Sequence, residues 1–218
     1  EAQILDKSSN FNNDIRATLV AVLEKQYASI ETSPLTKQNI EALKVSNTFT
    51  VTTGHQLNLF SGPLYFLYKI ISTINLTEEL KTKYPSFNFV PVYWMATEGL
   101  LEFFEIYKQE LGTTTNATAL KKLFEEAYLQ HDNLADATRH FANSLFGKQG
   151  LVILDPDDAT FKSIFIPYVK EELLHQRSHQ LVLETVEKLK DYTVQVNPRE
   201  INLFYIGDQL RERIIFEN

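Results

Sequence analysis

The stretch Thr48–Tyr65, TFTVTTGHQLNLFSGPLY, carries the most informative local signals for the fold of this chain. Its first six residues are rich in β-branched side chains, which is typical of a strand. Gly54 then interrupts that pattern. Ser61–Pro63 has the marks of a helix start, because serine caps helix N-termini and proline fits the first helical turn. We therefore predict a strand, a loop at Thr53–Gln56 and a helix over 62–83.

The neighbouring segments extend this unit into an α/β fold. Phe87–Met95, FNFVPVYWM, is nearly all apolar, which is typical of a strand buried on both faces. Leu151–Leu154 predicts a third buried strand. Helical spacing of apolar residues covers 11–30, 99–110, 117–129, 133–146 and a long segment 158–190 that should break or bend near Pro167. Short β-type segments follow at 192–196, 201–206 and 211–216. This alternation predicts an α/β fold with a mainly parallel sheet.

Composition excludes several classes of function. The formal net charge is −7, which disfavours a nucleic-acid partner because polyphosphate backbones are repelled. The chain has no cysteine, so it forms no disulfide, thiolate nucleophile or Cys-based zinc site. No apolar run approaches the roughly 18–20 residues of a membrane span, and no signal peptide opens the chain. We expect a cytoplasmic protein without a membrane partner.

The loop Thr53–Gln56 and the helix start at Ser61–Pro63 form a candidate anion site. A glycine lets a ligand approach the backbone closely, and a helix N-terminus offers N–H groups and a positive dipole end to a phosphate or carboxylate. His55 and Gln56 add donors and acceptors, while Lys69 adds charge only if it faces the cleft. The alternative is that the turn binds nothing, since the sequence is neither a Walker A motif nor a GxGxxG fingerprint.

Two further strand ends carry polar or aromatic candidates. Trp94 and Glu98 lie at or past the carboxyl end of the strand 87–95, where open α/β sheets place their ligands. Glu98 is able to bind an amine, a ribose hydroxyl or a metal, or else to stabilise the start of the following helix. Asp155 follows the third strand, but Asp155-Pro156 is also an ordinary turn sequence.

The histidines predict no metal site. His131, His140, His175 and His179 lie in polar helical segments, where a solvated helix surface is the simpler interpretation. His175 and His179 are four residues apart, but the stretch HQRSH lacks the glutamate of an HExxH motif. The sequence also lacks the GxSxG elbow of serine hydrolases.

Four motifs together resemble a known family. Thr52–Tyr65 with Tyr68-Lys69 resembles its TGxQ…F-x-GP-x-Y-x-x-Y-K signature, and Val90–Trp94 resembles its VPVFW strand. Gly150–Asp155 and Asn202–Tyr205 follow in the expected order. The family is BshC, the cysteine-adding enzyme of bacillithiol biosynthesis, and the resemblance runs from about residue 10 to 218.

The resemblance implies a Rossmann-like core with an inserted helical segment, and a C-terminal coiled coil that makes the full-length protein a homodimer. It also implies that the carboxyl group of cysteine is joined to the amine of glucosaminyl-malate. Since a free carboxylate must be activated, ATP or another nucleotide is expected. Candidate catalytic residues are Gln56 and Glu98, and candidate substrate- or nucleotide-binding residues are Thr53, Gly54, His55, Ser61, Gly62, Pro63, Tyr65, Lys69, Trp94, Asp155 and Asn202.

The chain also departs from the family. The expected parts are a helical lead-in (1–47), the first βαβ half of the core (48–98), an inserted helical segment (99–147) and a second part of the core (148–218). Family members continue the VPVFW strand into an acidic stretch of the type EDHDFEE, whereas here Glu98 runs directly into Gly99. The sequence also stops before the family's C-terminal half and coiled coil. Three hypotheses follow: part of a ligase, a non-catalytic nucleotide- or metabolite-binding module, or a structural domain with an empty site.

Overall fold

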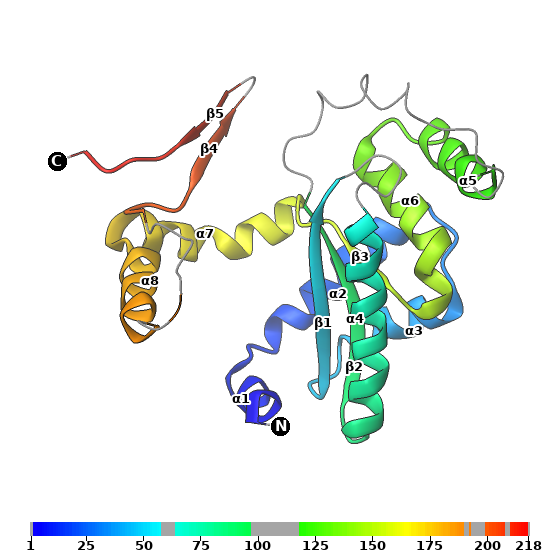
Figure 1. Ribbon diagram of the computed structural model, residues 1–218, viewed down its shortest axis with the longest axis horizontal. Coiled ribbons are helices and arrows are strands. Elements are labelled where there is room, and N and C mark those ends of the chain that lie inside the picture. Colours follow the sequence, from blue (N-terminus) through cyan, green and yellow to red (C-terminus); the bar gives the residue numbers. More distant parts are fainter. Residues whose placement is uncertain are drawn as a thin grey trace. The chain divides into compact units, whose positions relative to one another are not determined.

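The computed structural model describes residues 2–57, 64–96, 118–189, 192, 199–207 and 210–217 (Figure 1). They form two compact units, Glu1–Thr160 and Phe161–Asn218. The predicted helix over 99–110 lies outside the described residues, as does most of the predicted strand 192–196. None of the described helices is long and apolar enough to cross a membrane.

The first unit is built on a parallel sheet of three strands in the order β1-β2-β3. These are β1 (Thr48–Gln56), β2 (Asn88–Ala96) and β3 (Val152–Leu154). The register places Gly54 beside Trp94, and Trp94 beside Leu154. The Rossmann-like α/β fold with parallel strands is therefore confirmed.

Thr53–Gln56 is strand, not loop, and this corrects the sequence prediction. β1 pairs with β2 as far as Gln56 beside Ala96, and the N–H of Leu57 still donates to the carbonyl of Ala96 at 3.2 Å. Among the described glycines only Gly150 has a positive φ, so Gly54 does not turn the chain. The prediction failed because a glycine next to a long partner strand can remain extended.

Helices cover both faces of this sheet (Figure 1). The described helices of the first unit are α1 (Ala2–Asn10), α2 (Asp14–Tyr27), α3 (Pro34–Ala42), α4 (Leu64–Lys83), α5 (Thr118–Leu129) and α6 (Leu134–Phe146). α4 packs against one face of β1 and β2, whereas α2 and α3 lie on the other side. Ser33 and Asn133 start α3 and α6 by accepting hydrogen bonds from backbone N–H groups three residues on.

The core of this unit lies around β2. Tyr93 and Met95 of β2 and Ile70 of α4 are fully buried, and Phe66 of α4 is almost as inaccessible. Each such side chain contributes about 1.5–3 kcal/mol through burial. Proline is unusual in a central strand because it has no N–H to donate. Pro91 precedes the part of β2 that pairs with β3, so a ladder hydrogen bond is not lost.

The second unit holds most of α7 (Ala159–His175), together with α8 (Arg177–Lys188), β4 (Phe204–Gly207) and β5 (Leu210–Arg213). β4 and β5 form an antiparallel pair. The break predicted near Pro167 is displaced, since α7 continues through that proline and ends at His175. Gln176, with a φ of 48°, separates the two helices.

A buried carboxylate stabilises the junction of α7 and α8. Glu172 accepts hydrogen bonds from the N–H of Ser178 at 3.0 Å, from the Ser178 hydroxyl and from the N–H of Asn202 at 2.9 Å. Burial alone would raise the pKa of Glu172, but these hydrogen bonds outweigh it and hold the pKa below its usual value. The junction is therefore built from polar contacts that periodicity does not reveal.

Candidate functional site

Most of the predicted site residues lie at or near the carboxyl ends of the three parallel strands. Gly54 lies beside Trp94, and Gln56 lies two residues further along β1, beside Ala96. Open parallel sheets bind ligands outside the carboxyl ends of their strands. The carboxyl ends of the strands are therefore the candidate functional site, and a binding role there stays a prediction.

Side-chain alternation divides the predicted stretch between the two faces of the sheet. Along β1 the even-numbered residues are exposed, apart from Thr48, and the odd-numbered residues are partly buried. Thr53 and His55 belong to the face that α4 covers. Gly54 and Gln56 belong to the opposite face, with Thr52. A strand thus separates residues that a loop would have brought to a single ligand.

His55 belongs to the packing against α4. Its ring lies edge-on to Phe66, with centroids 5.2 Å apart, and its Nδ1 lies 2.8 Å from the carbonyl oxygen of Gln56. The hydroxyl of Tyr93 donates to the carbonyl of His55 at 3.3 Å. Burial raises the pKa of Tyr93, so this hydroxyl keeps its proton at neutral pH. These contacts fix the end of β1.

Lys69 reaches the backbone near the carboxyl end of β1, and its role in binding stays a prediction. Its Nζ donates a hydrogen bond to the carbonyl of Gly54 at 2.7 Å. Lys69 is the sixth residue of α4 and therefore lies in its second turn. The site therefore contains a positive charge at the carboxyl end of a parallel strand.

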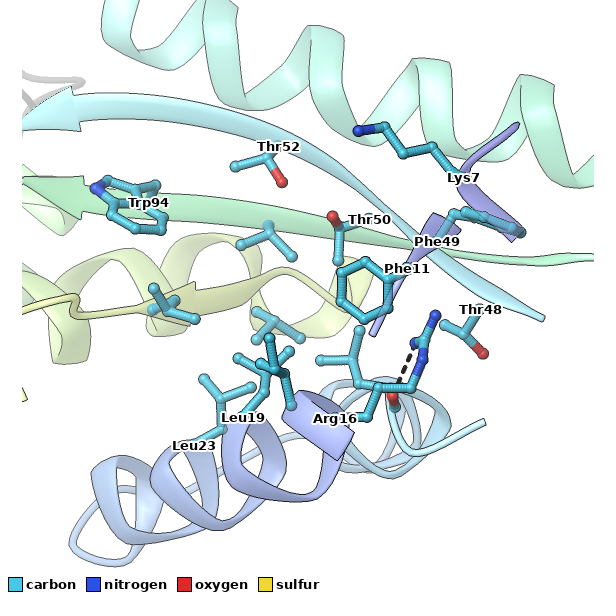
Figure 2. Close-up of a pocket in the computed structure, with 15 residues that line it drawn as sticks. Lys7, Phe11, Arg16, Leu19, Leu23, Thr48, Phe49, Thr50, Thr52 and Trp94 are labelled. Carbon is cyan, nitrogen blue, oxygen red and sulfur yellow. Dashed lines mark hydrogen bonds between the residues drawn. The ribbon is translucent and has the colours of Figure 1, made fainter. Parts of the chain in front are cut away.

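A cavity of about 400 Å³ lies on the other face, between the sheet and α1 and α2 (Figure 2). Trp94 lines it at the carboxyl end of the sheet, and the side chains of Thr50 and Thr52 line it along β1. Leu19 and Leu23 of α2 form part of the opposite wall. Small-molecule sites have volumes of about 300–1,000 Å³, so the space is adequate for one.

Sequence reasoning missed this cavity. Phe11, just after α1, and Arg16 of α2 line its far end, where the guanidinium lies 4.8 Å from the ring centroid of Phe11. Arg16 also donates to the carbonyl oxygens of Leu43 and Ser46, at 3.1 and 3.3 Å. The alternating threonines of β1 were the available signal, because polar residues at every second strand position mark a face without a tight apolar cover.

Asp155 is held by structural contacts. Its Oδ2 lies 3.5 Å from Nη2 of the buried Arg139, and its Oδ1 accepts from the N–H of Asp157 at 2.9 Å. Its backbone N–H and carbonyl are both bonded to the side-chain amide of Gln26. The predicted ligand role stays a prediction, but this carboxylate already joins α6 to the turn after β3.

Of the remaining predicted residues, only Asn202 has a described side chain. Glu98, Ser61, Gly62 and Pro63 lie outside the described residues, and so does the side chain of Tyr65. Asn202 belongs to the second unit, where its N–H donates to Glu172 and its Oδ1 accepts from Arg213 at 3.4 Å. Their roles in binding or catalysis stay predictions.

Two of the histidines pair with each other rather than lying separately on solvated helix surfaces. Nε2 of His131 and Nδ1 of His140 are 3.0 Å apart. Burial, and then the neighbouring His131, lower the pKa of His140. Within the described parts of the chain, no group of three or more histidines and acids is placed to hold a metal ion.

Comparison with known proteins identifies the sequence relationship. A family profile described as "Bacillithiol biosynthesis BshC, N-terminal Rossmann-like domain" matches residues 1–99 and 98–218. A protein of Flavobacterium johnsoniae is 62% identical over 250 residues, covering 100% of this chain and 47% of the relative. One of Flavobacterium psychrophilum is 56% identical, covering 99% and 47%. Both are named "Putative cysteine ligase BshC".

The same comparisons show what the relatives have in addition. The chain spans about half the length of the curated relatives it matches. The alignment with the Flavobacterium johnsoniae protein has 250 positions against the 218 residues of this chain, so at least 32 residues of that relative have no counterpart here. The family profile divides at 98–99, where the expected acidic stretch is missing after Trp94.

Proposed function

The chain belongs to the bacillithiol biosynthesis BshC family, and we propose that it forms the substrate-binding edge of a ligase. In the full-length protein this ligase joins the carboxyl group of cysteine to the amino group of glucosaminyl-malate. The observation that carries the proposal is the juxtaposition at the carboxyl end of the sheet. Gly54 is paired with Trp94, which lines a cavity of about 400 Å³, and the Lys69 ammonium donates to the Gly54 carbonyl.

The described residues suit a nucleotide together with a small acid. Trp94 has 37% of its surface exposed, so its indole can stack on a heterocyclic base, and the hydroxyls of Thr50 and Thr52 line the same cavity. Lys69 supplies a compact positive charge for a phosphate or carboxylate. ATP or another nucleotide would supply the leaving group that a free carboxylate lacks.

The proposed chemical roles follow from the side chains. Amide formation makes a C–N bond, breaks the C–O bond of the activated carboxyl group and releases a proton from the attacking amine. Gln56 does not titrate, so its role is to donate a hydrogen bond that orients the carboxyl group or stabilises developing negative charge. Glu98 is the candidate base for the amine proton. We include a cytoplasmic location and a homodimer formed through the family's coiled coil in this proposal.

Product formation is the direct test. The full-length relative from Flavobacterium johnsoniae, given cysteine, glucosaminyl-malate and one nucleotide at a time, should form the thiol amide, detected by mass spectrometry. Absence of that product with every nucleotide would remove the ligase assignment. Calorimetry with ATP then tests whether the 218-residue chain binds this nucleotide at the carboxyl ends of the strands. Trp94→Ala should weaken binding by roughly 5- to 160-fold, because base stacking contributes about 1–3 kcal/mol.

A second candidate function is a binding module that does not catalyse. It is favoured by the 32 or more residues of the relative that have no counterpart here and by the break in the family match at 98–99. This candidate predicts that the chain binds ATP without consuming it, even when the C-terminal half of the relative and both substrates are added. Formation of the amide in that mixture would exclude it.

A further inference from the structure

The two sides of β1 differ in how their backbone groups are used. The carbonyl of Asn47 accepts from the N–H of Asn88, and the N–H of Leu57 donates to the carbonyl of Ala96. In a regular parallel ladder alternate residues direct both backbone groups to the same side. The odd-numbered residues of β1 therefore bond to β2. The even-numbered residues direct their N–H and C=O groups to the outer edge of the sheet.

Side chains close the carboxyl end of this outer edge. The Gly54 carbonyl accepts from Lys69 at 2.7 Å, and the Gln56 carbonyl lies 2.8 Å from Nδ1 of His55. Between this end and the start of the strand lie Thr50 and Thr52. Throughout the described parts of the chain, no residue forms a hydrogen bond with the outward backbone groups of these two threonines.

The opposite edge of the sheet, along β3, is closed. The N–H of Ile153 donates to the hydroxyl of Tyr27 at 2.7 Å. The N–H of Asp155 donates to Oε1 of Gln26 at 3.1 Å, and Nε2 of Gln26 donates back to the carbonyl of Asp155 at 2.8 Å. Thr36 donates to the carbonyl of Leu151 at 3.4 Å. Side chains of α2 and α3 thus terminate the sheet on this side.

The sequence of β1 contains none of the usual protections of an exposed edge. Thr48–Gln56 is nine residues long and has no lysine, arginine, aspartate, glutamate or proline. Proteins protect outer strands with charges, prolines, bulges or short length, because open N–H and C=O groups recruit other strands. A long strand without these features is suited to an interior position in a sheet.

We propose that the outer edge of β1, at Thr48–Thr52, pairs with a parallel β-strand from the C-terminal half of the BshC polypeptide. This inference rests on the family membership behind the proposed function, because the matched relatives are about twice as long as this chain. Doubly wound sheets place their ligand where the strand order reverses. An added strand puts that point between itself and β1, at the end that Lys69 occupies.

Lys69 has a defined part in this arrangement. Its bond to the Gly54 carbonyl ends the outer edge before Gln56, so the added strand pairs through Thr50 and Thr52 and diverges beyond them. The divergence opens a crevice with the ammonium at its base. The site is thus shared between the two halves of the polypeptide, and neither half is sufficient for the ligase reaction.

Hydrogen exchange measured by mass spectrometry tests the pairing in intact protein. In the full-length Flavobacterium johnsoniae relative, the amides matching Thr50 and Thr52 should exchange at least about 100-fold more slowly than in the 218-residue chain, because only there are they bonded. Equal exchange in the two proteins would overturn the proposal. Slow exchange in the isolated chain, accompanied by dimerisation, would also overturn it by showing that a second copy occupies the edge.

Proline substitutions provide a matched second test. Thr52→Pro removes an outward N–H and leaves the ladder with β2 intact, whereas Thr53→Pro removes an N–H that bonds to β2. In the isolated chain, the Thr52→Pro variant should unfold at nearly the same denaturant concentration as the unmodified chain. The Thr53→Pro variant should unfold at a clearly lower concentration. In the full-length relative, proline at the position matching Thr52 should lower product formation at least about tenfold. Unchanged product formation would contradict the pairing.

The two proposals fail in different ways. Protected amides at the positions of Thr50 and Thr52 without thiol product would leave the pairing in place and remove the ligase assignment. Thiol product with fast-exchanging amides at these positions would leave the ligase in place and remove the strand. The two measurements together therefore assign any failure to one proposal.

Discussion

β1 and β3 are both outer strands of the described sheet. The outward backbone groups along β3 are hydrogen-bonded by side chains of neighbouring helices, whereas those of Thr50 and Thr52 in β1 have no such partner among the described residues. Tyr27 and Gln26 in the last turn of α2 reach its backbone, and Thr36 of α3 adds a third contact. Along β1, within the described residues, side chains contact the outward backbone groups only at the carboxyl end, at the carbonyls of Gly54 and Gln56. The helices that precede the sheet thus close its β3 side, and our proposal assigns the β1 side to another part of the polypeptide.

The largest expected effect is at the closed edge. Tyr27→Phe removes the hydroxyl that accepts from Ile153 and leaves a fully buried N–H without a partner. The free energy of unfolding should fall by about 1–3 kcal/mol, the cost of an unsatisfied buried group. Urea denaturation followed by circular dichroism measures this. Tyr68→Phe is the control, because Tyr68 is 59% exposed, and it should change the value by less than about 0.5 kcal/mol.

If Tyr27→Phe leaves the free energy of unfolding unchanged, the hydrogen bond from β3 to α2 does not stabilise the sheet. That result would contradict the contrast drawn between the β3 side and the β1 side. Ligand affinity provides a further check. Calorimetry with ATP should give the same affinity for the Tyr27→Phe chain as for the unmodified chain, since the β3 edge takes no part in the proposed site.

Gln26→Met should have a somewhat smaller effect on the same edge. Methionine keeps the length of the side chain but removes both the donor and the acceptor that bind Asp155. We expect a loss of about 1–2 kcal/mol in the free energy of unfolding, because two partly buried hydrogen bonds are lost. Lys25→Met on the same helix is the control, since the 3.4 Å ion pair of Lys25 with Asp158 is exposed and contributes little. Similar losses for both variants would show that Gln26 does not hold the edge.

Lys69→Met probes the contacted end of β1, where the expected change is in binding rather than folding. The 2.7 Å contact of Lys69 with the Gly54 carbonyl is exposed, so stability should change little. Loss of the charge should weaken ATP binding by about tenfold, equivalent to about 1.4 kcal/mol. Calorimetry measures the dissociation constant, and Lys69→Arg should retain much of the affinity. An unchanged affinity for Lys69→Met would remove this ammonium from the proposed site.

The sequence was informative about the elements of the sheet because their signals are local. Thr48–Thr53 and Phe87–Met95 carry their strand character in β-branched and apolar side chains, and both became strands. The break in α7–α8 was misplaced because Pro167 is a local signal, whereas Gln176 depends on contacts made elsewhere. Glu172, which accepts from Ser178 and Asn202, shows that such contacts decide where a helix ends.

The site was only partly predictable, for a different reason. The sequence predicted a site at the carboxyl ends of the strands, because residue order alone shows which residues come directly after a strand, and that site stays a prediction. It did not separate Gln56 from His55, since that separation depends on β1 continuing as a strand beyond Gly54. It also did not reveal the cavity at Trp94, whose other wall comes from Leu19 and Leu23, far away in the chain.

Gly54→Ala has the smallest expected effect and tests the correction at β1 itself. A Cβ at Gly54 would lie 3.8 Å from the Trp94 carbonyl and 3.9 Å from the Trp94 Cβ, which are ordinary contacts. Alanine should therefore raise the free energy of unfolding by about 0.5 kcal/mol, because glycine loses more conformational freedom on folding. Gly150→Ala should do the opposite, since Gly150 has a φ of 77° and a Cβ there would lie 2.5 Å from Nδ2 of Asn39. If urea denaturation shows both substitutions to be destabilising, Gly54 turns the chain after all, and the outer edge of β1 ends before it.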